Sequence, residues 1–155
     1  MVHKCIGTLL LTAALAACGN RPVAGTAPNG KNKETKYATC YRFASGGDSI
    51  RMQLFIADSG IKGTLLYDHP ARESQGGFFT GETRGDTLFA EYTFKAGGQA
   101  GVREVAFLRK GTGLLEGSGA TENRMGKTVF ANHAALTFSE SRLLEPVECA
   151  GANSQ

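Results

Sequence analysis

Cysteine, histidine and carboxylate side chains are the groups in this sequence whose chemistry could define a function. The chain has 155 residues, with four cysteines and three histidines. His69 lies beside a proline in an expected loop, and His133 lies at an expected bend. The candidate carboxylates are dispersed: Glu82, Asp86, Glu91 and Glu104. No H-E-x-x-H, G-x-S-x-G or Walker pattern occurs, so we expect a non-enzymatic protein without a metal site or cofactor.

Leu15-Ala16-Ala17-Cys18 ends an uncharged, largely apolar run that begins at Ile6, after the basic Lys4. This layout is typical of a secretory signal, and the run is shorter than the ~20 residues that span a bilayer. The four residues resemble the lipobox of bacterial lipoproteins, in which cleavage precedes the cysteine and its sulfur carries diacylglycerol. The resemblance implies a signal peptide over 1–17 and lipid attachment at Cys18. The alternative is an ordinary signal peptide cut near Ala17, which leaves a free thiol.

The lipobox resemblance also implies a location. Each buried methylene of an acyl chain contributes about 0.8 kcal/mol, so two or three chains hold a protein stably on a membrane. Gly19 stands where an aspartate would favour retention in the inner membrane, and no acidic run follows Cys18. We therefore expect a lipid anchor in the outer membrane of a bacterial envelope, with the protein facing the periplasm.

Residues 18–36 predict a flexible, basic tether, because they lack periodicity and are rich in Gly, Pro, Asn and Lys. The tether could favour anionic lipid, or its lysines could simply keep a linker soluble. From residue 37 onward, twelve basic and thirteen acidic residues nearly cancel. This balance argues against nucleic-acid binding, which uses a concentrated basic face.

The cysteine pattern predicts one disulfide bond. Cys5 belongs to the signal peptide and Cys18 to the lipid, which leaves Cys40 and Cys149 as an even pair in an oxidising compartment. No C-x-x-C spacing accompanies them, so a metal site is a poor alternative. A bridge between them would join the two ends of the patterned region.

Short strand-like runs alternate with turn clusters from residue 37 to residue 149. The expected strands are 37–45, 49–57, 61–67, 76–83, 87–95, 102–109, 114–121 and 127–138, with an extended end at 143–149. This pattern predicts an all-β domain: a single antiparallel meander of about eight strands that closes into a lipocalin-like barrel, or a sandwich. Residues 150–155 are expected to form a disordered tail.

An eight-stranded barrel has an interior that side chains fill or that holds one small ligand. Alternation in 49–57 and 87–95 places one apolar row of each strand inside: Ile50, Met52, Leu54, Ile56, Leu88, Ala90, Tyr92 and Phe94. The register of 102–109 cannot be assigned, since both of its faces mix charged and apolar residues. The candidate contacts for a small apolar ligand are Met52, Leu54, Tyr92 and Phe94.

Gly117-Ser118-Gly119-Ala120, followed by Gly126-Lys127, is similar to the S-G-A loop of the lipoprotein inhibitors of c-type lysozyme. That resemblance implies that Ser118 and Lys127 contact a target enzyme, although Thr121-Glu122 departs from the basic-aromatic pair of that family. In the alternative interpretation, the glycines relieve crowding or form a bulge in a bent strand.

The whole domain resembles lipocalin-like barrels, but without the tryptophan of their G-x-W motif. It also resembles small uncharacterised β-barrel lipoproteins of the Bacteroidota type, through GETRGDTLFAEYTF, REVAFLRKG and the bracketing cysteines. We therefore expect a monomeric, non-catalytic binding or accessory protein, whose partner is a small apolar ligand or an envelope protein. The alternative expectation is a protein-binding inhibitor.

Overall fold

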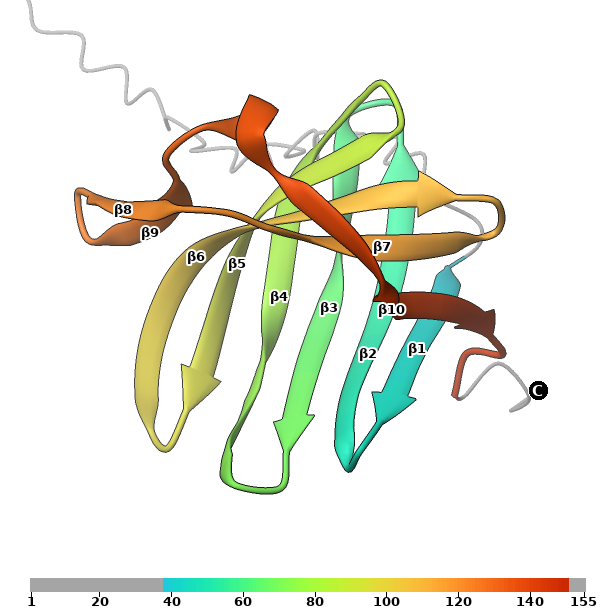
Figure 1. Cartoon of the computed structure of the whole chain (residues 1–155), viewed down its shortest axis with the longest axis horizontal. Coiled ribbons are helices and arrows are strands. Elements are labelled where there is room, and N and C mark those ends of the chain that lie inside the picture. Colours follow the sequence, from blue (N-terminus) through green and yellow to red (C-terminus); the bar gives the residue numbers. More distant parts are fainter. Residues whose placement is uncertain (1–37, 151–155) are drawn as a thin grey trace, which may run out of the picture. The chain divides into compact units, whose positions relative to one another are not determined.

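The computed structural model describes residues 38–150, which form ten strands and one short 3-10 helix (Figure 1). The strands are β1 (Thr39–Ser45), β2 (Asp48–Ala57), β3 (Gly60–His69), β4 (Arg72–Arg84), β5 (Thr87–Ala96), β6 (Gln99–Lys110), β7 (Gly113–Ser118), β8 (Thr121–Arg124), β9 (Lys127–Phe130) and β10 (Thr137–Val147). The helix, η1, spans His133–Ala135. None of the described residues forms a helix long and apolar enough to cross a membrane.

Eight of the strands close into an antiparallel barrel. Strands β1 to β6 pair in sequence order, β6 pairs with β7, β7 with β10, and β10 returns to β1. Strands β8 and β9 lie outside this ring as an antiparallel hairpin, which joins it through a parallel contact between β9 and β6. The prediction of an all-β, lipocalin-like barrel is confirmed.

Glycine pairs make two of the barrel's hairpins tight. Gly46-Gly47 joins β1 to β2 and Gly97-Gly98 joins β5 to β6, and all four residues have positive φ. Two-residue turns with positive φ match the twist of antiparallel strands. The loop expected over 96–101 is therefore only a two-residue turn.

Alternating side chains fill much of the interior, as the sequence predicted for β2 and β5. The predicted residues Ile50, Met52, Leu54, Leu88, Ala90 and Tyr92 are buried, together with Ile61, Leu65, Tyr67, Phe79, Val105, Phe107, Leu114 and Leu144. Phe94 packs against this core and is partly buried. The prediction for Ile56 is wrong: this side chain is 46% exposed, one residue before β2 ends at the barrel rim.

The predicted boundaries were wrong where strands carry polar residues. The expected link over 68–75 is mostly strand, because β3 continues to His69 and β4 begins at Arg72. Residues 122–126 are mostly strand β8, and the single strand expected over 127–138 is divided into β9, η1 and the start of β10. The turn expected over 139–142 lies within β10, at an irregular register opposite β7.

The hairpin of β8 and β9 turns at Met125 and Gly126, both with positive φ. Met125 is 97% exposed and has a φ of 49°, a conformation that residues other than glycine, asparagine and aspartate rarely adopt. In this type of hairpin turn, asparagine followed by glycine is the preferred pair. The tip therefore places an unfavourable residue at the turn.

Met125→Asn is expected to raise the free energy of unfolding by about 0.5 to 1 kcal/mol, because asparagine tolerates positive φ. Urea unfolding of the two proteins measures the difference. Met125→Ala is the control, since it removes the same side chain without relieving the backbone. Equal stability of the asparagine and alanine variants would contradict the prediction.

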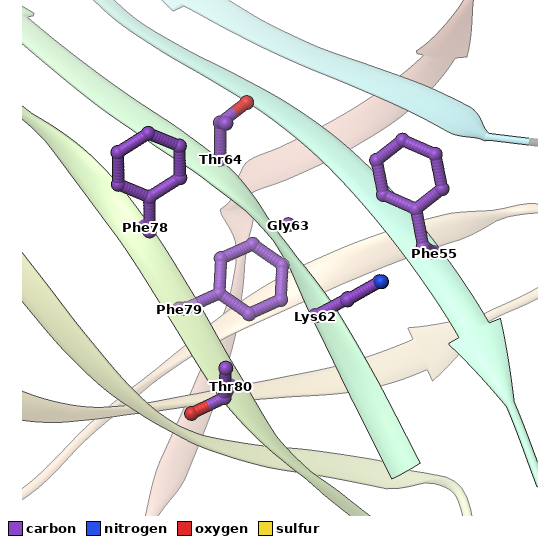
Figure 2. Close-up of a pocket in the computed structure, with 7 residues that line it drawn as sticks. All are labelled: Phe55, Lys62, Gly63, Thr64, Phe78, Phe79 and Thr80. Atoms are coloured by element: carbon purple, nitrogen blue, oxygen red, sulfur yellow. The ribbon is translucent and has the colours of Figure 1, made fainter. Parts of the chain in front are cut away.

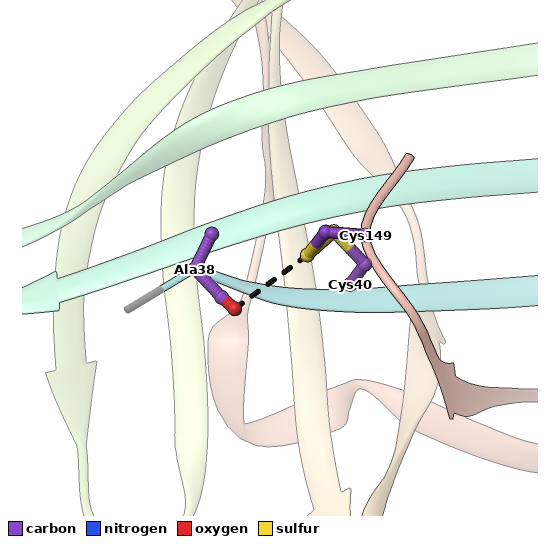
Figure 3. The surroundings of a disulfide bond; sticks show 3 residues. All are labelled: Ala38, Cys40 and Cys149. Carbon is purple, nitrogen blue, oxygen red and sulfur yellow. Dashed lines mark hydrogen bonds between the residues drawn. A yellow bond between two sulfur atoms is a disulfide. The ribbon is translucent and has the colours of Figure 1, made fainter. Parts of the chain in front are cut away.

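The predicted Cys40–Cys149 disulfide is present, with an S–S distance of 2.09 Å and a Cα–Cα distance of 5.2 Å. Figure 3 shows it at the start of β1, with the Cys149 sulfur 3.5 Å from the Ala38 carbonyl oxygen. That contact is not a hydrogen bond, because a disulfide sulfur has no proton to donate. Cys40 also faces Val147 of β10 across the β1–β10 pairing, so the bridge reinforces the seam that closes the barrel.

The predicted signal peptide, the lipid site at Cys18 and the tether lie outside the described residues. The same holds for residues 151–155 of the predicted tail.

Candidate functional site

A small polar pocket lies where β3 ends and β4 begins, and it faces β6, β7 and β10 across the barrel. Its volume is about 180 Å³. The lining residues are Tyr67, His69, Arg72, Gln75, Arg103, Glu116 and Arg142. We call this the mouth pocket. Each side chain comes from a strand of the ring, so the closed barrel fixes their relative positions.

The Arg103 guanidinium lies against an aromatic cluster. Its central carbon is 4.7 Å from the ring centroid of Tyr67, 5.5 Å from that of Tyr92 and 5.9 Å from that of Phe94. The rings of Tyr92 and Phe94 stack with centroids 5.2 Å apart. Cation–π attraction holds a guanidinium over such rings. Arg103 is thereby positioned without an ion-pair partner among the described residues.

On the other side of the pocket, Glu116 binds both Tyr67 and Arg142. Its carboxylate accepts a 2.7 Å hydrogen bond from the Tyr67 hydroxyl and lies 2.9 Å from Nη2 of Arg142. The Glu116 side chain is 14% exposed and that of Arg142 is 40% exposed, so the ion pair is partly buried. The Arg142 guanidinium also lies over the Phe43 ring, at 5.7 Å.

Three buried side-chain nitrogens at this site have no hydrogen-bond partner within the described part of the chain: Nδ1 of His69, Nε of Arg103 and Nε of Arg142. His69 Nδ1 is 3.0 Å from an Asp48 carboxylate oxygen, but the approach lacks hydrogen-bond geometry, so we treat it only as an electrostatic contact. Buried polar groups are normally paired. His69 Nδ1 faces Asp48, so the two arginines are the pocket's lining residues with a buried N–H donor that no described residue accepts.

Two of the four predicted ligand contacts are Tyr92 and Phe94. They do not line the pocket themselves, but their rings lie against Arg103, which does. Tyr92 is fully buried. Its hydroxyl donates to two backbone carbonyl oxygens, that of Gln75 at 2.8 Å and that of Leu65 at 3.0 Å. Met52 and Leu54 are packed in the apolar core and do not line the mouth pocket.

Burial raises the pKa of Tyr92 to about 12. Burial also raises the pKa of Tyr67 well above its usual value of 10, and the nearby Glu116 carboxylate raises it further. Both tyrosines are therefore held neutral in the folded protein at pH values where they ionise in the unfolded chain.

The protein is expected to lose stability in alkali. A raised pKa in the folded state stabilises the protein fully below the unfolded value near pH 10, and that contribution is lost as pH rises toward 12. By pH 11 the rise in the pKa of Tyr92 from 10 to about 12 costs about 1.4 kcal/mol of stability, and Tyr67 acts in the same direction. Urea midpoints from pH 8 to 11 test this, and Tyr92→Phe should flatten the decline. An unchanged slope in Tyr92→Phe would contradict the assignment.

Ser118 and Lys127, the residues implied by the lysozyme-inhibitor resemblance, have internal partners. The Ser118 hydroxyl is 3.0 Å from the Thr137 hydroxyl, and Lys127 forms an ion pair with Glu91. At Gly117, a Cβ atom would lie 2.8 Å from the Phe138 ring. This close packing supports the alternative interpretation, in which a glycine relieves crowding.

His133 and Glu104, which the sequence separates by 29 positions, meet beside the barrel at 2.9 Å. Glu104 also accepts a 3.0 Å hydrogen bond from the Phe130 backbone, and the His133 ring lies 4.7 Å from that of Phe89. Because one carboxylate binds both the end of β9 and the start of η1, the pair fastens the outer hairpin to β5 and β6.

Figure 2 shows a hollow on the outer face of the barrel, between Phe55 of β2 and Phe78 of β4. Its volume is about 540 Å³, and Phe78 is 72% exposed. Gly63 lies in β3 beneath it, and Phe79 packs from the inner face against that glycine. This surface is apolar and open, in contrast to the charged mouth pocket.

No family model, no curated protein and no solved structure matches this chain. The geometry of the described residues therefore carries the functional argument.

Proposed function

We propose that this chain is a lipid-anchored, monomeric protein of the bacterial envelope, with a non-catalytic barrel that binds a small ligand at the mouth pocket. The observation that carries the binding function is the convergence of three arginines on a pocket whose lining contains one carboxylate, with the buried Nε atoms of two of these arginines lacking a hydrogen-bond partner among the described residues. The lipobox at Leu15–Cys18 supports the anchor. The Cys40–Cys149 bridge is in keeping with an oxidising compartment.

The position of the mouth pocket also revises the predicted binding site. The sequence alone suggested an apolar ligand among Met52, Leu54, Tyr92 and Phe94. In the barrel, Met52 and Leu54 contribute to packing, whereas Tyr92 and Phe94 support Arg103 at the polar end. The proposed ligand accordingly binds above the aromatic cluster and presents hydrogen-bond acceptors to it.

Native mass spectrometry of the full chain purified from its host tests both parts of this proposal. We expect an N-terminal fragment that begins with an acylated Cys18, and a small molecule bound one per chain. Arg103→Gln should lose the molecule while Lys110→Gln, an exposed change on the same strand, should retain it. A free Cys18 thiol would contradict the anchor, and equal retention by both variants would contradict the site.

The outer hairpin favours a second candidate, a protein-binding inhibitor. Figure 1 shows β8 and β9 projecting from the ring, and Met125 at their turn is 97% exposed. Single exposed apolar residues are common on protein surfaces, so what favours this candidate is the position of Met125 at the tip of a projecting hairpin, where it is accessible to a partner. This function predicts that excess protein inhibits c-type lysozyme and that Met125→Ser weakens the inhibition. Unaltered lysozyme activity would argue against it.

A further inference from the structure

The mouth pocket contains more positive charge than its own carboxylate can balance. Three arginines line it, at positions 72, 103 and 142, against the single carboxylate of Glu116. Glu116 is already bound by Tyr67 and Arg142. Neither Arg72 nor Arg103 forms an ion pair within the described residues, so these two cations are free to bind another anion.

The arginine guanidinium groups of this pocket are well suited to binding an anion. Arginine presents N–H donors in a planar fork, which fits carboxylate and phosphate oxygens. Nε of Arg103 and Nε of Arg142 are both buried donors without an acceptor. A hydrogen bond to an anion is stronger in such a partly water-excluded site than at an open surface.

The pocket's size limits what can enter. At about 180 Å³ it is smaller than the ~300–1,000 Å³ of pockets that enclose a drug-sized ligand. It can take a small anion, or only the anionic end of a larger molecule. Arg72 is exposed at its rim, where it can contact the ligand as it enters.

We propose that the ligand of the mouth pocket is a small oxyanion, or a molecule ending in one, bound through a carboxylate or phosphate group by Arg103, with Arg142 and Arg72. This proposal rests on the proposed binding function, which it deepens by naming the chemical class of ligand. The aromatic cluster of Tyr67, Tyr92 and Phe94 holds Arg103 in place and sets the depth of the pocket.

Titration calorimetry and thermal unfolding of the full chain test the ligand class. The probes are inorganic phosphate, acetate and succinate, each compared with chloride at equal ionic strength. We expect saturable binding and a raised melting temperature with at least one oxyanion, because a ligand that binds only the folded state stabilises it. A preference for phosphate over succinate, or the reverse, distinguishes a phosphate ligand from a carboxylate.

Two variants and a control locate the site. Arg103→Gln is expected to weaken oxyanion binding about tenfold or more, the scale of losing a charge-assisted hydrogen bond. Arg72→Gln, at an exposed position, should weaken it several-fold without a risk to folding. Lys110→Gln removes the same charge from an exposed site on β6 and should bind like the wild type.

The outcomes separate this proposal from the proposed function. Equal weakening in Lys110→Gln, or no response to any oxyanion, would overturn the ligand class. If an uncharged molecule nonetheless copurifies with the wild type and is lost in Arg103→Gln, the binding function stands and only the oxyanion is wrong. Weaker oxyanion binding in both Arg103→Gln and Arg72→Gln, with folding intact in Arg72→Gln, supports the proposal.

Discussion

Replacing Cys40 and Cys149 together with alanine is expected to lower the free energy of unfolding by about 2 to 5 kcal/mol. The bridge spans 109 positions, and a cross-link over a long loop restricts the unfolded chain strongly. It also lies at a weak seam. Strands β1 and β10 share three register pairs, one of which contains Pro146, and proline has no backbone N–H to donate.

Urea unfolding of the double variant, with and without reductant, measures this effect. The wild type should fall to the level of the variant when it is reduced, and the variant should not respond to reductant. Hydrogen exchange should accelerate first at Tyr41 and Arg42, which pair with β10. Uniform acceleration over the whole barrel would contradict a role specific to the seam.

Glu116→Leu is expected to lower the free energy of unfolding by about 3 kcal/mol, within the range for removing one partner of a buried ion pair. The change leaves the Tyr67 hydroxyl and the Arg142 guanidinium without their acceptor. We place the expected loss at the lower end of that range because the Arg142 side chain is partly exposed to water. Chemical unfolding measures the loss.

Glu82→Leu is the matched control, since Glu82 forms an exposed ion pair with Arg84 on the same strand. Exposed pairs contribute about 0 to 1 kcal/mol, so this variant should differ little from the wild type. Adding Arg142→Leu to Glu116→Leu should recover part of the loss, because the arginine charge that Glu116 had paired is then removed as well. A further, additive loss in the double variant would contradict this explanation.

The barrel could be predicted from sequence where one row of a strand is apolar and the other polar. In β2 and β5 that alternation correctly identified Met52 and Tyr92 as interior. Strand β8 was missed because all four of its residues are exposed and thus give no alternation. Ile56 was misplaced because the periodicity of a strand does not show where the barrel ends.

The mouth pocket could not be predicted, because its inward row breaks the usual polarity rule. Strand β6 places Arg103 inside with Val105 and Phe107, and this charged interior residue left the register of 102–109 unassigned. What makes Arg103 acceptable there is the aromatic cluster from β3 and β5. Those rings are distant in the sequence, so only the three-dimensional fold brings them to the arginine.

The pairing of β1 with β10 has a consequence for biosynthesis. The N-terminal end of a chain emerges first, so β1 appears before all other strands and β10 after them. Strand β1 therefore stays unpaired on one edge until β10 is available. Until then, the outer edge of β1 exposes unpaired backbone groups, a known route to aggregation. Hairpins β1–β2 through β5–β6 can form as soon as their strands have emerged from export, because their contacts are local. Ring closure and thiol oxidation are therefore expected to be the late, slow steps of its maturation.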